Sequence, residues 1–162
     1  MREYVLGFVF DKSTHDTESP VVLLILKDRP AKLKGMLNGI GGKINGNETP
    51  IRAMMREAKE ESNLEFLDWI QFGKLINKSS SKIDDDLSII HLFTAFSEGL
   101  DGVDNKEDSE VNFPTPLGYL PFYIKTKKCM PNLAYLVPAA YNRVKGFDKT
   151  FITLELEDII KR

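Results

Sequence analysis

Glycine is concentrated in one short stretch of this chain, and that stretch limits the possible fold more than any other feature of the sequence. Residues 35–44 contain four glycines, and a polar segment then leads to the pair Thr49 and Pro50. Such a density is typical of a backbone that approaches a ligand closely or adopts unusual dihedral angles. The stretch therefore predicts a loop in which the conformation of the backbone matters more than the side chains.

A helix is predicted directly after this loop and is expected to end near Asn63. Thr49 is a good N-cap residue, and Pro50 is tolerated at the first helical position. Apolar residues then recur at helical spacing, at Ile51, Met54, Met55 and Ala58. The spacing thus predicts an amphipathic helix whose start is set by the end of the loop.

Strands and loops alternate through most of the remaining sequence. Short runs rich in valine, leucine and phenylalanine predict strands at residues 4–10, 21–27, 66–76, 87–96 and 151–156. A second helix is predicted at residues 132–144, and a short strand or turn at 117–122. Polar or acidic segments predict loops at residues 11–18, 28–34, 78–86 and 98–110, the last of them mobile. Because no repeat or linker occurs, we expect a single domain over residues 1–162.

Length, charge and composition exclude several classes of function. A chain of 162 residues is long enough for one well-packed domain. Its net charge of −2 provides no overall field that would attract nucleic acid or an anionic membrane. The N-terminus lacks the apolar core of a signal peptide, and no apolar run is long enough to span a membrane. Cys129 is the only cysteine, so no intrachain disulfide can form, and a cytoplasmic location is expected.

Several charged residues gather on the predicted helix, within six positions of one another. Glu57 lies three and four positions before Glu60 and Glu61, so the three carboxylates can share one helical edge. They repel one another there, and a divalent cation such as Mg²⁺, which prefers hard oxygen ligands, would remove the conflict. Glu48 precedes the helix, where the helix dipole favours negative charge, and Arg56 can reach back to it. The alternative for this pattern alone is a solvated acidic face.

The glycines and these charges together resemble the sequence box of the Nudix hydrolase superfamily, G-x5-E-x7-R-E-U-x-E-E-x-G-U, where U is aliphatic. The matching positions are Gly42, Glu48, Arg56, Glu57, Glu60, Glu61 and Leu64. Ala58 is small for its aliphatic position, and Asn63 replaces the final glycine. Because asparagine tolerates the left-handed conformation best after glycine, we expect the loop–helix–loop geometry to survive at a modest cost in stability.

The resemblance implies an α/β fold, the Nudix-type α/β/α sandwich with a central mixed β-sheet. It also implies hydrolysis of a nucleoside diphosphate linked to another group, with Mg²⁺ or Mn²⁺ as cofactor. By position, the metal ligands would be Glu57, Glu60, Glu61 and the carbonyl of Gly41, and one of the glutamates would act as general base. Arg56 and Glu48 complete the set of catalytic residues that the box predicts. Which glutamate is the base stays open.

Two further segments resemble Nudix enzymes that remove oxidised purine nucleoside triphosphates. Residues 37–43 are similar to the stretch WNGFGGK of that group, with leucine for tryptophan and isoleucine for phenylalanine. Asn38 takes the position whose amide hydrogen-bonds the base. Residues 130–138 resemble the segment that closes the base pocket, with Asn132 in place of an acidic residue and Met130 in place of a stacking tryptophan. These residues are therefore the predicted base-binding positions.

Three charged residues outside the helix are further candidates for the site. Glu110 lies in the acidic loop near the position where relatives place an additional carboxylate ligand, and the alternative is a solvated loop acid. Lys27 ends the second predicted strand and can contact phosphate, or it merely blunts the end of a strand. Lys43 follows the paired glycines and has the same two interpretations.

The sequence leaves three functions open, each with a small-molecule nucleotide as partner and none with nucleic acid or a membrane. The first is a housecleaning pyrophosphatase that cleaves a purine (d)NTP, oxidised or unmodified, to the monophosphate and pyrophosphate. The second is a Nudix hydrolase of ADP-ribose, a dinucleoside polyphosphate or an RNA cap, and the lack of a basic stripe argues against RNA. The third is a non-catalytic nucleotide sensor, which would not need three crowded glutamates. The oligomeric state is not predicted.

Overall fold

A mixed β-sheet forms the centre of the computed structural model, which describes residues 1–78, 87–100, 103 and 110–157. The strand order within these ranges is β3-β2-β1-β5-β4-β7, and β6 also pairs with β2. The β1–β5 and β4–β7 pairs are parallel, and the other pairs are antiparallel. The strands are β1 (Arg2–Asp11), β2 (Val21–Leu26), β3 (Leu37–Asn38), β4 (Ile70–Lys78), β5 (Leu87–Ser97), β6 (Val111–Pro116) and β7 (Ile152–Glu157).

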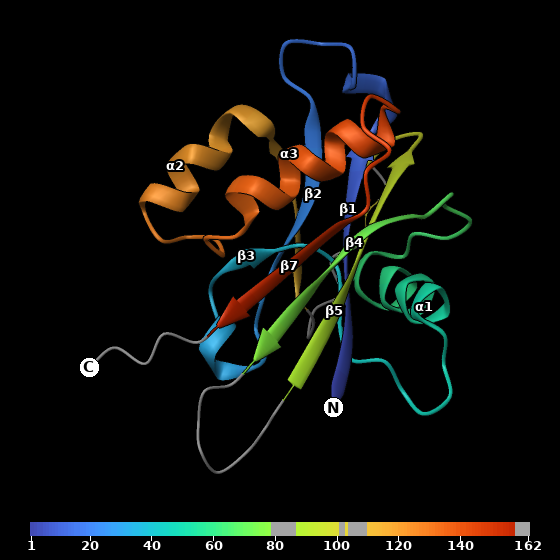
Figure 1. The fold of residues 1–162 in the computed structure, drawn as a ribbon. Helices are drawn as coiled ribbons and strands as arrows, with labels where there is room; N and C mark the ends of the chain where they lie inside the picture. Colours follow the sequence, from blue (N-terminus) through green and yellow to red (C-terminus); the bar gives the residue numbers. More distant parts are fainter. Residues whose placement is uncertain (79–86, 101–102, 104–109, 158–162) are drawn as a thin grey trace.

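Helices cover both faces of this sheet (Figure 1). The helix α1 (Pro50–Ser62) packs on one face, and α2 (Leu120–Lys125) and α3 (Leu133–Val144) pack on the other. Short 3₁₀ helices lie at Lys12–Thr14, Ala31–Leu33 and Leu117–Tyr119. Among the helices of the described ranges, none has the length and apolar character needed to cross a membrane. The predicted α/β/α sandwich around a mixed sheet is confirmed.

Two hydrophobic cores fill the spaces between the three layers. Successive side chains of a strand point to opposite faces of the sheet, so neighbours on β2 enter different cores. Leu23 belongs to the core that contains Met54 of α1, whereas Leu24 belongs to the core that contains Leu136 of α3. By the same alternation Lys27, which follows β2, lies on the face of the sheet that α1 covers.

The glycine-rich segment lies beside β1 and approaches its backbone closely. The N–H of Val5 donates to the carbonyl of Gly42 at 2.9 Å, and the N–H of Gly7 donates to the carbonyl of Ile40 at 2.7 Å. A Cβ atom at Gly41 would lie 2.1 Å from the carbonyl oxygen of Val5, a distance that no side chain tolerates. Glycine is therefore required here by contact with a strand, before any ligand is considered.

The predicted elements at β1, β2, α1, β5, α3 and β7 are confirmed, and Pro138 lies inside α3 as expected. The strand predicted at residues 66–76 begins only at Ile70, since Phe66 has a φ of 58° and is turned into solvent. Residues 117–122, predicted as a strand or turn, are helical: they form the 3₁₀ helix Leu117–Tyr119 and the start of α2. The loops predicted at 78–86 and 98–110 fall largely outside the described residues.

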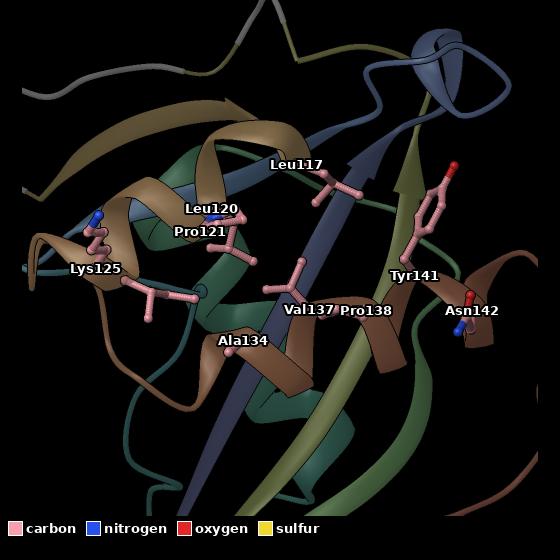
Figure 2. A pocket seen from close by; sticks show the side chains of 10 residues that line it. Leu117, Leu120, Pro121, Lys125, Ala134, Val137, Pro138, Tyr141 and Asn142 are labelled. Atoms are coloured by element: carbon pink, nitrogen blue, oxygen red, sulfur yellow. The ribbon is translucent and has the colours of Figure 1, made fainter.

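An apolar groove of about 510 Å³ lies between α2 and α3 (Figure 2). Its walls include Leu120 and Ile124 of α2 and Ala134 and Val137 of α3. This groove is on the side of the sheet opposite α1, and no carboxylate of the described ranges lines it. It is therefore separated by the sheet from the charged residues that the sequence singles out.

Asn63 ends α1 in the left-handed conformation, with a φ of 54° and a ψ of 25°. Its N–H donates to the carbonyl of Lys59 at 3.1 Å, and the N–H of Leu64 donates to the carbonyl of Ala58 at 3.2 Å. These bonds satisfy the last carbonyls of the helix, as expected for such a cap. The expectation that asparagine preserves the geometry of the missing glycine is confirmed.

Replacement of Asn63 with valine is expected to lower the free energy of unfolding by about 1–2 kcal/mol, because a β-branched side chain fits the left-handed region poorly. Asn63→Gly is the matched control and should remain within about 0.5 kcal/mol of the wild type. Urea denaturation followed by circular dichroism measures both variants. Equal stability of N63V and the wild type would contradict a strained cap at this position.

Candidate active site

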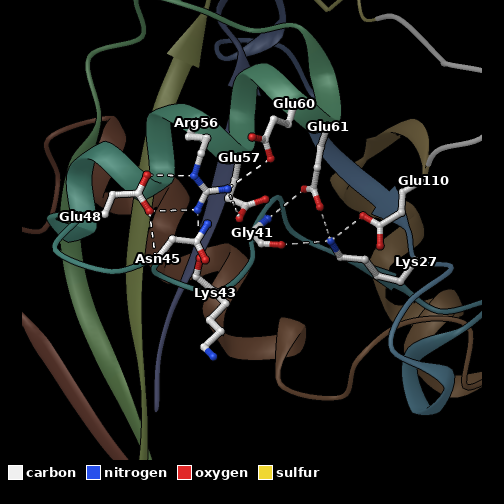
Figure 3. Close-up of polar contacts among 10 residues, drawn as sticks. All are labelled: Lys27, Gly41, Lys43, Asn45, Glu48, Arg56, Glu57, Glu60, Glu61 and Glu110. Atoms are coloured by element: carbon white, nitrogen blue, oxygen red, sulfur yellow. Dashed lines mark hydrogen bonds and ion pairs between the residues drawn. The ribbon is translucent and has the colours of Figure 1, made fainter. Parts of the chain in front are cut away.

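Arg56 is the centre of the first polar network of the site (Figure 3). Its guanidinium donates from Nε to Glu48 Oε1 at 2.9 Å and from Nη2 to Glu48 Oε2 at 3.0 Å. Nη2 also donates to the carbonyl oxygen of Lys43 at 3.0 Å, and the N–H of Asn45 donates to Glu48 at 3.1 Å. The predicted reach of Arg56 back to Glu48 is confirmed, and this bidentate pair ties the glycine-rich loop to α1.

The same guanidinium neutralises two of the helix glutamates. Nη1 donates to Glu57 Oε1 at 2.7 Å and to Glu60 Oε2 at 3.2 Å. Glu57 is buried, whereas the side chain of Glu60 is 58% exposed. The hydrogen bond to Glu48 is the main cause that raises the pKa of Arg56, and the same bond lowers the pKa of Glu48. A cation of the protein itself thus relieves part of the repulsion expected among the helix carboxylates.

Lys27 is the centre of the second network, and only 6% of this residue is exposed. Its Nζ donates to Glu61 Oε1 and to Glu110 Oε2, each at 2.8 Å, and to the carbonyl of Gly41 at 3.3 Å. Leu26 pairs with Val111 across the β2–β6 ladder, so Lys27 and Glu110 follow directly opposite one another. The side chain of Glu110 is 12% exposed, which excludes the solvated loop acid considered from the sequence.

Burial and charge act in opposite directions in this cluster. Burial lowers the pKa of Lys27, but the neighbouring Glu61 and Glu110 carboxylates raise it by more, so the net shift is upward. Burial raises the pKa of Glu61 to about 8, against the opposing effect of the Lys27 ammonium. Hydrogen bonds from Glu61 and Lys27 outweigh burial at Glu110 and lower its pKa. The stable ion pair of the cluster is therefore that between Lys27 and Glu110.

Two polar residues that the sequence did not single out hold the end of α1 against the sheet. Ser62 Oγ donates to Asn112 Oδ1 at 2.6 Å, and Asn112 Nδ2 donates to the carbonyl of Glu61 at 2.9 Å. Both residues are buried. The only sequence signal was alternation, because Asn112 lies two residues after Glu110 and a strand places such residues on one face.

The paired glycines make room for two glutamates of α1. A Cβ atom at Gly42 would lie 2.3 Å from Glu57 Oε1, so only glycine lets this carboxylate occupy its position. The N–H of Gly41 donates to Glu61 Oε2 at 3.0 Å. The loop therefore positions the helix carboxylates directly, through its backbone and through the absence of side chains.

The resemblance predicted that Glu57, Glu60 and Glu61 bind a divalent cation, and this ligand set stays a prediction. Glu57 and Glu60 face Arg56, and no three histidine, cysteine, aspartate or glutamate side chains in the described part of the chain surround a common metal position. Instead, oxygens of Gly41, Glu61 and Glu110 all point at one positive charge, the ammonium of a lysine. Carboxylate and carbonyl oxygens are hard donors of the kind that divalent cations such as Mg²⁺ prefer.

The predicted substrate-binding residues lie around β3 and the start of α3. The N–H of Met130 donates to the carbonyl of Leu37 at 3.1 Å, which brings the segment before α3 beside Asn38. Asn38 Oδ1 accepts from the N–H of Gly39, and Asn132 Oδ1 is buried without a hydrogen-bond partner among the described residues. The side chain of Lys43 points away from the carboxylates (Figure 3).

Comparison with known proteins agrees with this geometry. The NUDIX domain family model matches residues 2–128, and a comparison with curated proteins finds no match. The NUDIX domain of Shewanella oneidensis NrtR complexed with ADP ribose is 18% identical, with a TM-score of 0.66 over 87% of this chain and 86% of that one. MutT from Bacillus halodurans is 14% identical, with a TM-score of 0.65 over 97% of this chain and 90% of that one. The C. elegans Ap4A hydrolase in a binary complex is 15% identical, with a TM-score of 0.63 over 91% of this chain and 100% of that one.

The likeness to these solved structures shows the fold, and the family match shows the family. That match covers well over half of the chain and includes both the glycine-rich loop and α1. Nudix hydrolases generally use divalent metal ions, and the donor set described above fits such an ion. The chain therefore belongs to the NUDIX family and is a Nudix hydrolase of pyrophosphate-containing substrates.

Proposed function

We propose that this enzyme hydrolyses a purine nucleoside triphosphate, oxidised or unmodified, to the monophosphate and pyrophosphate, with Mg²⁺ as cofactor and Mn²⁺ as a substitute. The observation that carries the proposal is the convergence of oxygens from Gly41, Glu61 and Glu110 on a single positive charge beside α1. In the reaction, water adds across one phosphoanhydride bond. Its oxygen joins the attacked phosphorus, the bridging oxygen leaves with the other phosphate group, and a proton is released.

The residues of this cluster divide into metal ligands and an acceptor for the proton. Bound Mg²⁺ supplies a water of lowered pKa and neutralises charge on the phosphates. Gly41, Glu61 and Glu110 would hold this ion through their oxygens. Glu57 lies one turn before Glu61 in α1, and Glu60 directly precedes Glu61. Either glutamate would serve as a further ligand or accept the proton of the attacking water.

Other charged residues position the carboxylates of α1 and the glycine-rich loop. Arg56 holds Glu57 and Glu60 through Nη1 and holds the loop through Glu48, so one side chain fixes the separation between helix and loop. Arginine suits this role because its planar guanidinium presents several donors in a fixed geometry. Lys27 and Lys43 contribute positive charge for the phosphates of the substrate.

Base recognition is assigned to Asn38, Asn132 and Met130. Asn132 Oδ1 is a buried acceptor without a partner among the residues that the structure describes, and an N–H donor of a purine would satisfy it. The amide of Asn38 offers both a donor and an acceptor. Met130 precedes α3 and provides a polarizable side chain beside the ring.

A second candidate is hydrolysis of another diphosphate linkage, and the structural neighbours favour it. The NrtR NUDIX domain is complexed with ADP ribose, and the C. elegans protein is an Ap4A hydrolase. The same carboxylates serve either linkage, since only the group beyond the diphosphate differs. A panel of purine and pyrimidine triphosphates, oxidised triphosphates, ADP-ribose and Ap4A, each with Mg²⁺, tests the choice. Preference for ADP-ribose or Ap4A over every triphosphate would overturn the first proposal in favour of the second.

Substitution of Glu61 with glutamine is expected to lower kcat at least about a hundredfold, because a neutral amide is a poor ligand for Mg²⁺. Circular dichroism should show an unchanged fold. Glu65→Gln is the control, since Glu65 is exposed and pairs with Lys59 outside the site. Activity of E61Q close to the wild type would remove Glu61 from the proposed ligands.

Gly42→Ala is expected to lower kcat about tenfold or more while the protein stays folded, because the added methyl group displaces the Glu57 carboxylate. Gly118→Ala is the matched control, since no heavy atom of the described residues beyond its two chain neighbours lies within 4 Å of a Cβ at that position. Steady-state rates at saturating Mg²⁺ compare the two variants. Equal rates for G42A and G118A would show that the position of Glu57 is unimportant.

Asn38→Ala is expected to raise KM for purine triphosphates about tenfold, the effect of one lost hydrogen bond to the base. Pyrimidine triphosphates should change little, because they have no purine edge for Asn38 to contact. Initial rates over a range of substrate concentrations give KM for each compound. Equal losses for all substrates would argue that Asn38 supports the loop and does not contact the base.

A further inference from the structure

The ammonium of Lys27 is surrounded by hydrogen-bond acceptors of the protein. An ammonium group has three N–H donors, and all three have oxygen acceptors here, from Glu61, Glu110 and Gly41. Both carboxylate side chains are largely buried, so solvent screens the pair weakly. The group is thus fully coordinated within the protein, which is unusual for a lysine at the end of a strand.

The oxygens around this ammonium come from three different parts of the chain. Gly41 belongs to the glycine-rich loop, Glu61 to the last turn of α1, and Glu110 to the residue before β6 (Figure 3). Each oxygen is a hard donor of the kind that Mg²⁺ and Mn²⁺ prefer. The Lys27 ammonium and a divalent ion on the same oxygens would repel each other strongly at low dielectric, so the ammonium would weaken binding of the ion.

We propose that Lys27 is an internal cation that occupies the metal position of the empty enzyme and leaves it when a divalent metal binds. The inference rests on the proposed function, since it takes Gly41, Glu61 and Glu110 as metal ligands. The metal therefore competes with a side chain of the same protein. The affinity of the enzyme for the metal in the absence of nucleotide is set by that competition.

Only the side chain of Lys27 needs to move. Its backbone N–H donates to the carbonyl of Met36 at 2.9 Å, and its carbonyl accepts from the N–H of Gly35 at 2.8 Å. The flexible four-carbon stem can carry the ammonium away from the carboxylates without disturbing these bonds. A phosphate of the nucleotide is the natural new partner, so metal and nucleotide bind cooperatively. Lys27 thus makes metal binding depend on the presence of substrate.

Mn²⁺ binding without nucleotide, measured by the EPR signal of the free ion, tests the competition. Lys27→Met removes the charge and should bind Mn²⁺ at least about tenfold more tightly than the wild type. Lys59→Met is the matched control, because it removes an exposed lysine of α1 that pairs with Asn63 and Glu65. K59M should stay within about twofold of the wild type. Equal or weaker Mn²⁺ binding by K27M would overturn the proposal.

A measurement on the wild-type enzyme keeps the test decisive if K27M fails to fold. Acetylation by a reagent for amines, read by mass spectrometry at each lysine, should be slow at the buried Lys27 and should rise several-fold when Mn²⁺ is added. Lys59 should react equally with and without Mn²⁺. No increase at Lys27 under saturating Mn²⁺ would show that the ammonium does not leave, and the inference would fail.

The two proposals fail in different ways. If the wild type is inactive with Mg²⁺ on every diphosphate of the panel, the proposed function fails. If E61Q retains full activity, the assignment of Glu61 as a metal ligand fails. If hydrolysis requires Mg²⁺ and is lost in E61Q, while K27M and K59M bind Mn²⁺ alike, only the role of Lys27 as an internal cation fails.

Discussion

The site depends on one constraint, the close approach of the glycine-rich loop to β1. Added Cβ atoms at Gly39 and Gly41 would meet carbonyl oxygens of β1 at 2.6 Å and 2.1 Å. Because Gly39 and Gly41 have no side chains, this segment can pair with the strand through its backbone and lie beneath α1. Its peptide groups then serve two purposes, because the N–H of Gly41 donates to Glu61 while its carbonyl accepts from Lys27. A backbone contact that looks purely structural thus sets where the carboxylates can be.

Charge compensation is the second condition for this arrangement, and the protein meets it with its own cations. Arg56 bonds to Glu48, Glu57 and Glu60, and Lys27 bonds to Glu61 and Glu110. A buried carboxylate without such a partner would be strongly destabilising. The two cations differ in setting, because the Arg56 network is partly open to water whereas Lys27 is enclosed. Release of Lys27 therefore exposes an organised set of oxygens, while the Arg56 network keeps loop and helix together.

Local patterns predicted much of this fold, and long-range pairing explains what they missed. Apolar periodicity located α1 and α3, and the spacing of Gly42, Glu48 and Arg56 indicated the loop–helix unit. The strand β6 was not predicted, and it contains Pro114 and Pro116, which an edge strand tolerates. The pairing of Lys27 with Glu110 spans 83 positions and follows only from the register of β2 and β6. The helices at 117–125 were missed because Gly118 and Pro121 resemble turn signals, although proline is also tolerated in a first helical turn.

An enzyme that gathers carboxylates for a metal must also be stable before the metal arrives. Structural zinc sites solve this by coupling folding to the ion, so the chain unfolds without it. The Lys27 ammonium gives a different solution, since it satisfies Gly41, Glu61 and Glu110 in the empty protein and makes the fold independent of metal. The consequence is weaker binding of a free ion, because the ion must displace a partner that is already in place. A metal that arrives with nucleotide phosphates avoids this penalty, since those phosphates receive the displaced ammonium. Stability without metal and selectivity for the metal–nucleotide complex then have one cause, the position of a single lysine at the end of β2.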